Sequence, residues 1–233
     1  MTENSQNYLD LLNKEQRNAV QQTDGSLLVL AGAGSGKTRV LTFRILNILI
    51  KKLATPRQIL AVTFTNKAAQ EMNNRVSTLL KKSSTGLPWL GTFHSISAKL
   101  LRKHASAVNL NSNFSIIDQD DQVRLIKNIC KDENIDVKKI SPKYILAVID
   151  RWKNKGFYPE KVILKQKDVI EQGILKIYKI YQKKILDLNA CDFGDLILHC
   201  VNIFENNSDI KNIYSNNFKY ILVDEYQDTN FIQ

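Results

Sequence analysis

The chain has 233 residues, a mass of 26.7 kDa and a formal net charge of +10, and it is long enough for one large or two modest domains. Its polar, acidic start, MTENSQNYLD, does not resemble a signal peptide. The longest apolar run, Val40 to Leu53, is interrupted by Arg44, Asn47 and two lysines, which excludes a membrane span. Three irregularly spaced cysteines suit reduced thiols, so we expect a cytoplasmic protein.

The positive charge is unevenly distributed. Residues 138–184 hold thirteen Lys or Arg against four acids, whereas residues 118–136 hold six acids against three bases. A basic region favours a polyanionic partner, and nucleic acid is the first such partner to consider. A lysine-rich solvated surface, in a protein whose composition favours Lys, Asn and Ile, would give the same pattern. Charge alone therefore leaves both interpretations open.

Apolar runs alternate with helical patterns in the first third of the chain. Strands are predicted at Leu27–Ala31, Ile59–Phe64 and Trp89–Phe93. Helices are predicted between them, at Gly36–Leu53 and from Asn66 to about Lys82. This alternation is typical of a parallel α/β sheet covered by helices.

Strand patterns nearly vanish between His94 and about Asn217. Helices are predicted there at Ser95–Ala105, Asp120–Lys131, Pro142–Trp152, about Lys167–Leu188, and Asp192–Phe204. A strand pattern then returns at Tyr220–Val223. The sequence therefore predicts an α/β domain with a mostly helical domain inserted between two of its strands, and the loops near Ser83–Pro88 and Ser215–Phe218 are the expected crossing points.

The stretch LLVLAGAGSGKTRVL places a glycine-rich turn between a predicted strand and a predicted helix. Backbone N–H groups of such a turn can surround phosphates, while the helix N-terminus faces the charge. Lys37 can reach the β- and γ-phosphates, and Thr38 can ligate Mg²⁺. Ala31 replaces the first glycine of the usual pattern, but the strand–loop–helix context favours phosphate binding over a plain helix-capping turn. The predicted phosphate-binding residues are Gly32, Ala33, Gly34, Ser35, Gly36, Lys37 and Thr38.

Two adjacent acids, Asp224 and Glu225, follow the last predicted strand. Acids at the carboxyl end of an apolar strand are costly to hold unless a cation or a substrate balances their charge. Asp224 is suited to hold Mg²⁺ together with Thr38, and Glu225 is suited to accept a proton from an attacking water. We therefore predict nucleotide hydrolysis; the alternative is a surface turn whose acids serve solubility.

The nucleotide's base is less clearly indicated. Asn66-Lys67 begins like the N-K-x-D guanine-reading motif, but Ala69 occupies the place of the aspartate, so guanine specificity has no support. Gln16 carries an amide that can both donate to and accept from the edge of adenine. Asn13 and Gln16 are also spaced as a helix cap and its reciprocal partner, and spacing alone favours the cap.

Six segments in order along the whole chain resemble motifs of the UvrD/Rep/PcrA-type superfamily 1 DNA helicases. They are LNKEQRNAV, AGAGSGKTRVLT, AVTFTNKAAQEM, GTFHSI, DFGDLI and ILVDEYQDTN. The resemblance implies a RecA-like fold in an ATP- and Mg²⁺-dependent motor that moves 3′ to 5′ on single-stranded DNA and separates duplexes in replication or repair. It implies that residues 1–89 plus 217–233 form a truncated first motor domain, 1A, and residues 90–216 its helical 1B insert.

The resemblance also suggests roles for individual residues. Gln16 stands at the family's adenine-reading glutamine, Arg39 matches a position close to the nucleotide, and Gln227 lies where the family couples hydrolysis to DNA. The positions that correspond to DNA contacts are Phe64, Thr65, Asn66, Thr92 and His94. Without the family, Phe64 reads as a core residue and His94 as a helix cap. DFGDLI alone reads as a second acidic site, although a helix cap with a packing role is the favoured interpretation.

Members of this family continue for several hundred residues beyond D-E-x-Q-D. The additional parts are another strand of the first motor domain and a second motor domain, whose arginines complete the ATP site; comparable charge supplied in trans carries about 10³–10⁵ in rate. We therefore expect an N-terminal part that is inactive by itself and that needs, for example, a separately encoded C-terminal helicase part. The alternative is a truncated remnant that binds nucleotide or DNA without helicase activity.

Overall fold

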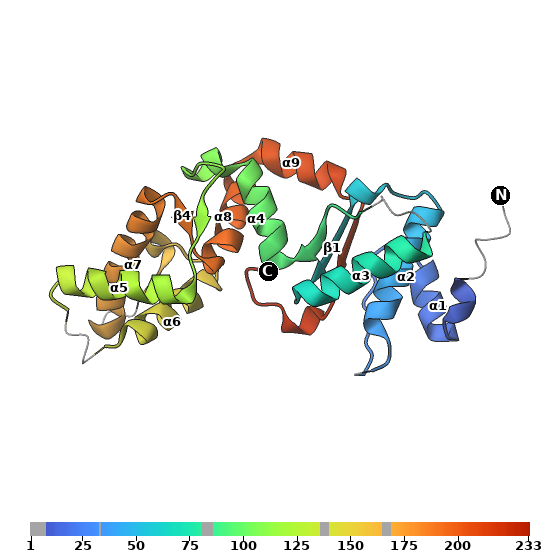
Figure 1. Ribbon diagram of the computed structural model, residues 1–233, viewed down its shortest axis with the longest axis horizontal. Helices are drawn as coiled ribbons and strands as arrows, with labels where there is room; N and C mark the ends of the chain where they lie inside the picture. Colours follow the sequence, from blue (N-terminus) through green and yellow to red (C-terminus); the bar gives the residue numbers. More distant parts are fainter. Residues whose placement is uncertain (1–7, 33, 81–85, 136–139, 165–168) are drawn as a thin grey trace. The chain divides into compact units, whose positions relative to one another are not determined.

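The chain forms two compact units. The computed structural model describes residues 8–32, 34–80, 86–135, 140–164 and 169–233 (Figure 1). The sheet unit comprises Met1–Ile96 and Asn212–Asp228, and the helical unit comprises Ser97–Lys211 and Thr229–Gln233. Among the described helices, none is long and apolar enough to cross a membrane.

Three parallel strands form the sheet of the sheet unit. They are β1 (Ile59–Thr63), β2 (Leu90–Thr92) and β5 (Tyr220–Val223), in the order β2-β1-β5. In the central strand β1, Val62 lies opposite Gly91 on one side and Val223 on the other. Because the strands are parallel, their carboxyl ends share one edge of the sheet. This arrangement confirms the predicted α/β class.

Helices α1 (Lys14–Gln21), α2 (Lys37–Ile50) and α3 (Asn66–Leu79) also belong to the sheet unit. The shared core of α2, α3 and the sheet contains Ile45, Ile48, Ile59, Ala61, Met72, Val76 and Leu222. Met72 and Val76 are one helical turn apart, so they lie on the same face of α3 and are fully buried. This packing holds the start of α2 close to the carboxyl edge of the sheet.

The predicted strand at Leu27–Ala31 is wrong. In the described part of the chain, no backbone hydrogen bond joins this segment to a strand, and Leu28 and Leu30 are 67% and 86% exposed. A strand is stable only when its N–H and C=O groups are paired with a neighbour. Ile221 on the edge strand β5 is also 64% exposed, so β5 is a strand because it pairs with β1. An apolar run without such a partner does not form a strand.

The helical unit is built mainly from α5 (Gln119–Asp132), α6 (Pro142–Lys153), α7 (Val169–Asp187) and α8 (Phe193–Asn206). Two short parallel strands, β3 (Ser115–Ile116) and β4 (Ala190–Cys191), accompany them. Its core is formed mostly by Ile126, Ile129, Ile145, Ile149, Ile174, Ile177, Tyr178 and Ile185. The four helices agree with the predicted ones to within about two residues at each end.

Two helices run across the boundaries between the units. They are α4 (Phe93–Lys103) and α9 (Ser208–Asn217), and the chain passes between units after Ile96, after Lys211 and after Asp228. The expected crossing points were loops near Ser83–Pro88 and Ser215–Phe218; residues 83–85 lie outside the described part. A boundary inside a helix has no turn residues to mark it. The remaining short 3-10 turns are Leu9–Leu11, Pro56–Gln58, Ala105–Val108, Pro159–Lys161 and Tyr226–Asp228.

Candidate nucleotide-binding site

The glycine-rich turn leads directly into helix α2. Gly36, the N-cap of α2, has φ 89°, and Gly34 has φ 76°. Both angles lie in the left-handed region, which glycine adopts without the strain that a side chain would cause. The first N–H groups of α2 have no partner within the helix, so they are available to a phosphate. Ala33, also a predicted phosphate-binding residue, lies outside the described residues.

Lys37 lies over the turn that precedes it. Its Nζ donates hydrogen bonds to the carbonyl oxygens of Ala31 (3.2 Å) and Gly32 (3.3 Å), and Ser35 Oγ donates to Gly32 O (2.7 Å). No described carboxylate forms an ion pair with Lys37. The ammonium group is therefore held by neutral acceptors, which a phosphate can replace with a charge-assisted bond.

Thr38 and Asp224 come together although 186 positions separate them. Thr38 Oγ1 donates to Asp224 Oδ2 at 3.1 Å. Asp224 is 6% exposed, and its N–H donates to Val62 O at 2.9 Å, which continues the β5–β1 ladder. Octahedral Mg²⁺ has oxygen ligands at about 2.0–2.1 Å, so two adjacent ligands lie about 3 Å apart. The two oxygens have the chemistry and the separation that a shared Mg²⁺ requires.

Glu225 has an unusual backbone conformation, with φ 48°. This left-handed conformation costs roughly 1–2 kcal/mol for a residue with a side chain, and such strain is found preferentially at functional sites. Gln227 Nε2 donates to Glu225 Oε2, and the Asp228 N–H donates to Glu225 O at 2.9 Å. Gln227 thus contacts the Glu225 carboxylate, while the Asp228 N–H holds the Glu225 main chain.

Gln16 makes both kinds of contact that the sequence suggested for a cap. Its N–H donates to Asn13 Oδ1 (2.8 Å), and its Oε1 accepts from the Asn13 N–H (3.2 Å), so the predicted reciprocal cap is confirmed. The amide Nε2 of Gln16 also donates to Ser35 O at 3.0 Å. The cap therefore holds this amide against the glycine-rich turn, and a role toward adenine stays a prediction.

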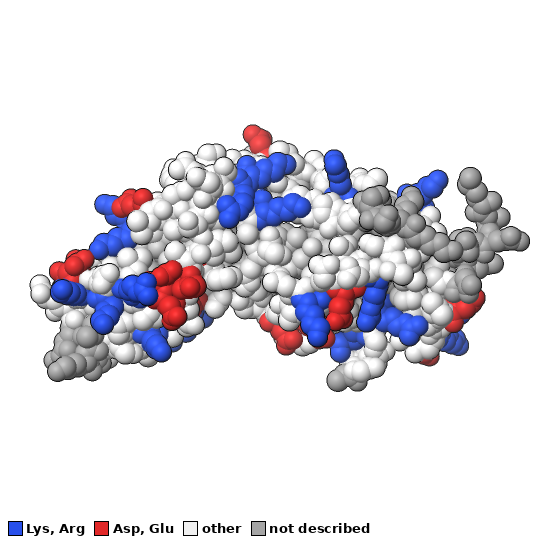
Figure 2. All heavy atoms as spheres, in the orientation of Figure 1, with Lys and Arg blue, Asp and Glu red and all other residues white. Residues whose placement is uncertain are grey.

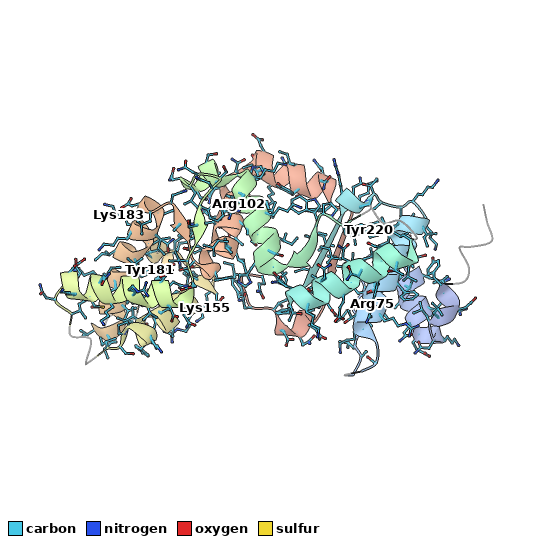
Figure 3. The ribbon with its side chains drawn as sticks, in the orientation of Figure 1. Arg75, Arg102, Lys155, Tyr181, Lys183 and Tyr220 are labelled. Carbon is cyan, nitrogen blue, oxygen red and sulfur yellow. The ribbon has the colours of Figure 1, made fainter. Side chains whose placement is uncertain are left out.

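Arg39 borders a shallow hollow between α2 and α3. Its guanidinium donates to Leu11 O at 2.6 Å and lies 5.5 Å from the centre of the Phe43 ring. The hollow has a volume of about 530 Å³, and its lining consists of Arg39, Phe43, Asn74, Arg75, Thr78 and Leu79. Arg75 projects from α3 (Figure 3) and was not a predicted site residue. Only the packing of α3 against α2 brings this second arginine beside Arg39.

The residues predicted to contact DNA lie at the ends of two neighbouring strands. Phe64 follows β1, and its ring packs edge-on against Phe93 with ring centres 5.9 Å apart. Thr65 is the N-cap of α3 and accepts from the Ala68 N–H at 3.1 Å. Thr92 is likewise a cap, because its Oγ1 accepts from the Ser95 N–H at 3.1 Å. Both hydroxyls therefore have structural partners.

The other two predicted DNA contacts differ in exposure. Asn66, the first residue of α3, is exposed, whereas His94 is half-buried. Burial lowers the pKa of His94, so its imidazole is neutral near pH 7. The register that pairs Thr63 with Thr92 places all five predicted residues at the carboxyl edge of the sheet, the same edge that carries Asp224.

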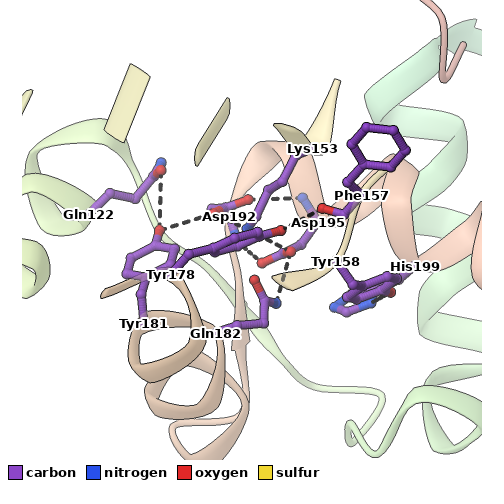
Figure 4. Close-up of polar contacts among 10 residues, drawn as sticks. All are labelled: Gln122, Lys153, Phe157, Tyr158, Tyr178, Tyr181, Gln182, Asp192, Asp195 and His199. Carbon is purple, nitrogen blue, oxygen red and sulfur yellow. Dashed lines mark hydrogen bonds and ion pairs between the residues drawn. The ribbon is translucent and has the colours of Figure 1, made fainter. Parts of the chain in front are cut away.

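The second acidic segment, DFGDLI, forms a buried cluster in the helical unit (Figure 4). Asp192 is the N-cap of α8, and its side chain accepts from the Asp195 N–H at 2.8 Å, so the predicted helix cap is confirmed. Lys153 Nζ donates to Asp192 Oδ2 (2.6 Å) and Asp195 Oδ1 (2.7 Å). All three side chains are buried, and this cluster, which the sequence did not predict, joins α6 to α8.

Acids accompany the basic side chains that the structure describes between residues 140 and 184. On the face shown in Figure 2, Lys and Arg of the helical unit are interspersed with Asp and Glu. Several lysines form exposed ion pairs, including Lys176 with Glu133 (2.6 Å) and Lys184 with Asp132 (3.0 Å). Asp132, the last residue of α5, and Glu133 after it thus neutralise part of the charge on α7.

Residues 12–233 match the family described as UvrD/REP helicase N-terminal domain. The chain is 48% identical over 232 residues to a "Probable DNA helicase II homolog" of Rickettsia conorii. It is 45% identical over 222 residues to "ATP-dependent DNA helicase PcrA" of Staphylococcus epidermidis and 44% identical over 229 residues to the protein of that name in Bacillus subtilis.

These alignments cover 98%, 95% and 98% of this chain but 35%, 30% and 31% of the three relatives, in the order given. The chain therefore spans about a third of the length of these relatives. The family match covers nearly all of the chain, including the glycine-rich turn, the carboxyl edge of the sheet and the Thr38–Asp224 pair. The chain belongs to the UvrD/REP helicase N-terminal domain family.

Proposed function

We propose that this chain is the N-terminal ATP-binding part of an ATP-dependent helicase. The whole enzyme would translocate 3′ to 5′ on single-stranded DNA and unwind duplexes at single-strand/double-strand junctions in replication or repair. The observation that carries the proposal is the 3.1 Å contact between Thr38 Oγ1 and Asp224 Oδ2. It joins the glycine-rich turn to the acidic strand end, as nucleotide hydrolysis requires.

In this proposal Lys37 and the N-terminus of α2 bind the β- and γ-phosphates of ATP. Thr38 and Asp224 would hold Mg²⁺, which supplies positive charge to the phosphate oxygens. Glu225 accepts the proton of the attacking water, and Gln227 keeps its carboxylate oriented. Gln16 and Arg39 border the side of the site where we place the base.

Single-stranded DNA is the proposed partner of the carboxyl edge. Phe64 would stack on a base, while Thr65, Asn66, Thr92 and His94 would contact phosphate or sugar. Lysines between residues 138 and 184 would add phosphate contacts from the helical unit. Since that charge is partly neutralised by acids, we expect weak binding that depends strongly on salt.

We further propose that the sheet unit corresponds to motor domain 1A and the helical unit to 1B. The rest of the relatives' length would correspond to a second motor domain, carried by the same or by a separate polypeptide. The edge of β5 and the exposed Leu28 and Leu30 support the need for such a partner, because both are open to a further strand.

ATP turnover in the presence of saturating oligo(dT) tests the proposal. The 233-residue chain alone should show negligible turnover, because cationic groups reach the transition state from one side only. Turnover should appear when a polypeptide covering the remaining part of a relative is added. Glu225→Gln should then abolish turnover and spare ATP binding, since the amide cannot accept a proton.

Two outcomes would oppose this assignment. Robust DNA-stimulated turnover by the 233-residue chain would show that it needs no second domain. Binding of nucleotide and DNA without turnover, even with the added polypeptide, would favour the alternative of a non-catalytic remnant. A Phe64→Ala variant checks the DNA surface: it should weaken oligo(dT) binding without altering the salt slope, because stacking releases no counterions.

A further inference from the structure

The last five residues of the chain, Thr229–Gln233, belong to the helical unit, although they follow the acidic segment of the sheet unit directly. The segment is internally closed: the Asn230 N–H donates to Gln233 Oε1, and the Gln233 N–H donates to Asn230 Oδ1, both at 3.1 Å. We call Thr229–Gln233 the strap. It is a short, hydrogen-bonded turn rather than an extended tail.

The strap is attached to the end of α6. Asn230 Nδ2 donates to Asn154 Oδ1 at 2.9 Å. Ile232 lies near the same turn, since its Cδ1 is 4.0 Å from the place that a Cβ on Gly156 would occupy. One hydrogen bond therefore attaches the strap to the turn that ends α6, with Ile232 close to it.

The turn that receives the strap is a regular helix ending. The Gly156 N–H donates to Lys153 O (2.8 Å), and the Phe157 N–H donates to Trp152 O (3.0 Å). Gly156 has φ 80°, the left-handed conformation that such an ending requires. The end of α6 thus has a regular, hydrogen-bonded conformation.

The end of α6 is also bound by the buried cluster in Figure 4. Lys153 is the last residue of α6, and its ammonium group binds Asp192 and Asp195 at the start of α8. A Cβ added to Gly194 would approach Lys153 Cδ to 2.9 Å, which shows how closely the two helices pack. The end of α6 cannot shift without breaking buried ion pairs.

The proposed general base, Glu225, lies in the turn that leads directly into the strap. Asp228 immediately precedes Thr229, and its N–H donates to Glu225 O at 2.9 Å. Gln227 holds the Glu225 carboxylate, and Glu225 itself has the strained φ of 48°. A strained backbone conformation persists only where its surroundings hold it, so the contacts of Gln227 and Asp228 help to hold Glu225 in place.

We propose that the strap couples the helical unit to Glu225, with Asn154 and Asn230 as positioning residues. The inference rests on the proposed function: a DNA strand bound to the helical unit would act on the strap through the end of α6, and the strap would transmit that effect along the chain to Glu225. Occupancy of the DNA site then changes the affinity for ATP, and the reverse holds by linkage.

The test uses the affinity of the 233-residue chain for a fluorescent ATP analogue with Mg²⁺, measured with and without saturating oligo(dT). The ratio of the two dissociation constants measures the coupling. Asn230→Asp removes the donor to Asn154 but keeps Oδ1 for the Gln233 N–H, so the ratio should move toward one by about two- to tenfold, as expected for one hydrogen bond. Asn154→Asp keeps the acceptor, so the ratio should stay at the wild-type value.

Asn206→Asp on α8 is the charge-matched control, since Asn206 is exposed and, among the described residues, its side-chain amide donates to Asn202 alone. Oligo(dT) affinity measured without nucleotide should be unchanged in all three variants. If the ratio of dissociation constants is one in the wild type, or is unchanged in Asn230→Asp, the proposed coupling through the strap is wrong. The proposed function is not affected by that result. Failure of the wild-type chain to bind nucleotide or oligo(dT) would overturn the proposed function and the strap with it.

Discussion

Two lysines, each hydrogen-bonded to two oxygen atoms, have opposite surroundings. Lys153 is fully buried and binds two carboxylates, and its ammonium group also faces the rings of Tyr178 and Tyr181 at 5.7 and 5.3 Å. Lys37 is partly exposed and is held by main-chain carbonyl oxygens. The first lysine has found its counter-charges within the fold, whereas the second has not.

The two acidic pairs differ in the same way. Asp192 accepts from Lys153, Tyr181 and the Asp195 N–H, and Asp195 accepts from Lys153, Gln182 and the Asp192 N–H. In contrast, Asp224 accepts from Thr38 and from the Glu225 N–H and forms no ion pair with a described residue. Carboxylates that lack counter-charges are placed to bind a cation.

This difference separates a structural charge cluster from a ligand site. Burial of a charge without partners costs several kcal/mol, so a buried cluster must be complete within the protein. Charged groups at the edge of a sheet can lack counter-charges within the protein, because water and a ligand interact with them instead. The two lysines should therefore respond oppositely to mutation: Lys153 should affect stability, and Lys37 should affect binding.

Removal of the Lys153 charge should have the largest effect. Lys153→Met leaves two buried carboxylates without their cation and should destabilise the helical unit by about 3–5 kcal/mol in urea unfolding. Adding Asp192→Asn and Asp195→Asn should recover much of the loss, because no buried charge then remains. Lys161→Met, which breaks an exposed pair with Glu205, should cost less than about 1 kcal/mol. Equal losses in the two single variants would contradict the structural role of the cluster.

Lys37→Ala should have the opposite effect: it should lower nucleotide affinity and leave stability nearly unchanged. Affinity for an ATP analogue with Mg²⁺ should fall by about 1.5–3 kcal/mol, the value of a charge-assisted hydrogen bond, or about tenfold to more than a hundredfold. The free energy of unfolding should stay within about 0.5 kcal/mol, because Lys37 has no charged partner to lose. Lys51→Ala, at the other end of α2, is the control. Unchanged nucleotide affinity would mean that the glycine-rich turn is structural.

Glu225 should show that the site, unlike the cluster, is not optimised for stability. Glu225→Gly should be about 0.5–1 kcal/mol more stable than Glu225→Ala, because glycine adopts φ 48° without strain although it gains more entropy on unfolding. Thermal unfolding of both variants measures the difference. If the alanine variant is the more stable one, the left-handed conformation at position 225 is not a source of strain.

The smallest effect concerns pH. Burial, with the nearby Asp192 carboxylate, raises the pKa of Asp150 to about 6 from its usual value near 3.8. The folded state thus holds this proton more tightly than the unfolded chain, so the contribution of Asp150 to stability is lost as pH rises through 6 and grows as pH falls from 7 toward 4. Burial also raises the pKa of Asp192, which acts in the same direction.

Urea unfolding of the wild-type chain and of Asp150→Asn between pH 7 and pH 5 measures this effect. The wild-type chain should gain more stability on acidification than Asp150→Asn, and the exposed Asp120→Asn should behave as the wild type does. Equal gains in the wild type and in Asp150→Asn would assign the pH dependence to other groups. The range stops at pH 5, because protonation of other carboxylates that are hydrogen-bonded in the native state follows at lower pH.

Local patterns predicted much of the fold and of the site. The strand Tyr220–Val223 was predicted to the residue, because its apolar run ends sharply at the acids of the site. The Asn13–Gln16 and Asp192–Asp195 caps follow from spacing within one helical turn, and both are present. The order of the six motifs was also sufficient to predict the family. For the strand and the two caps, the determining interactions lie within a few residues of one another.

What only the tertiary structure decided depends on contacts between distant segments. Leu27–Ala31 has strand-like residues, but within the described ranges no strand pairs with its backbone. Lys153 is one lysine among many in the sequence, and only the packing of α6 on α8 makes it the counter-ion of Asp192 and Asp195. Sequence spacing determines which groups can pair locally. Folding decides which partners surround a charged group. It therefore decides whether the group has a counter-charge inside the protein or stays available to a ligand.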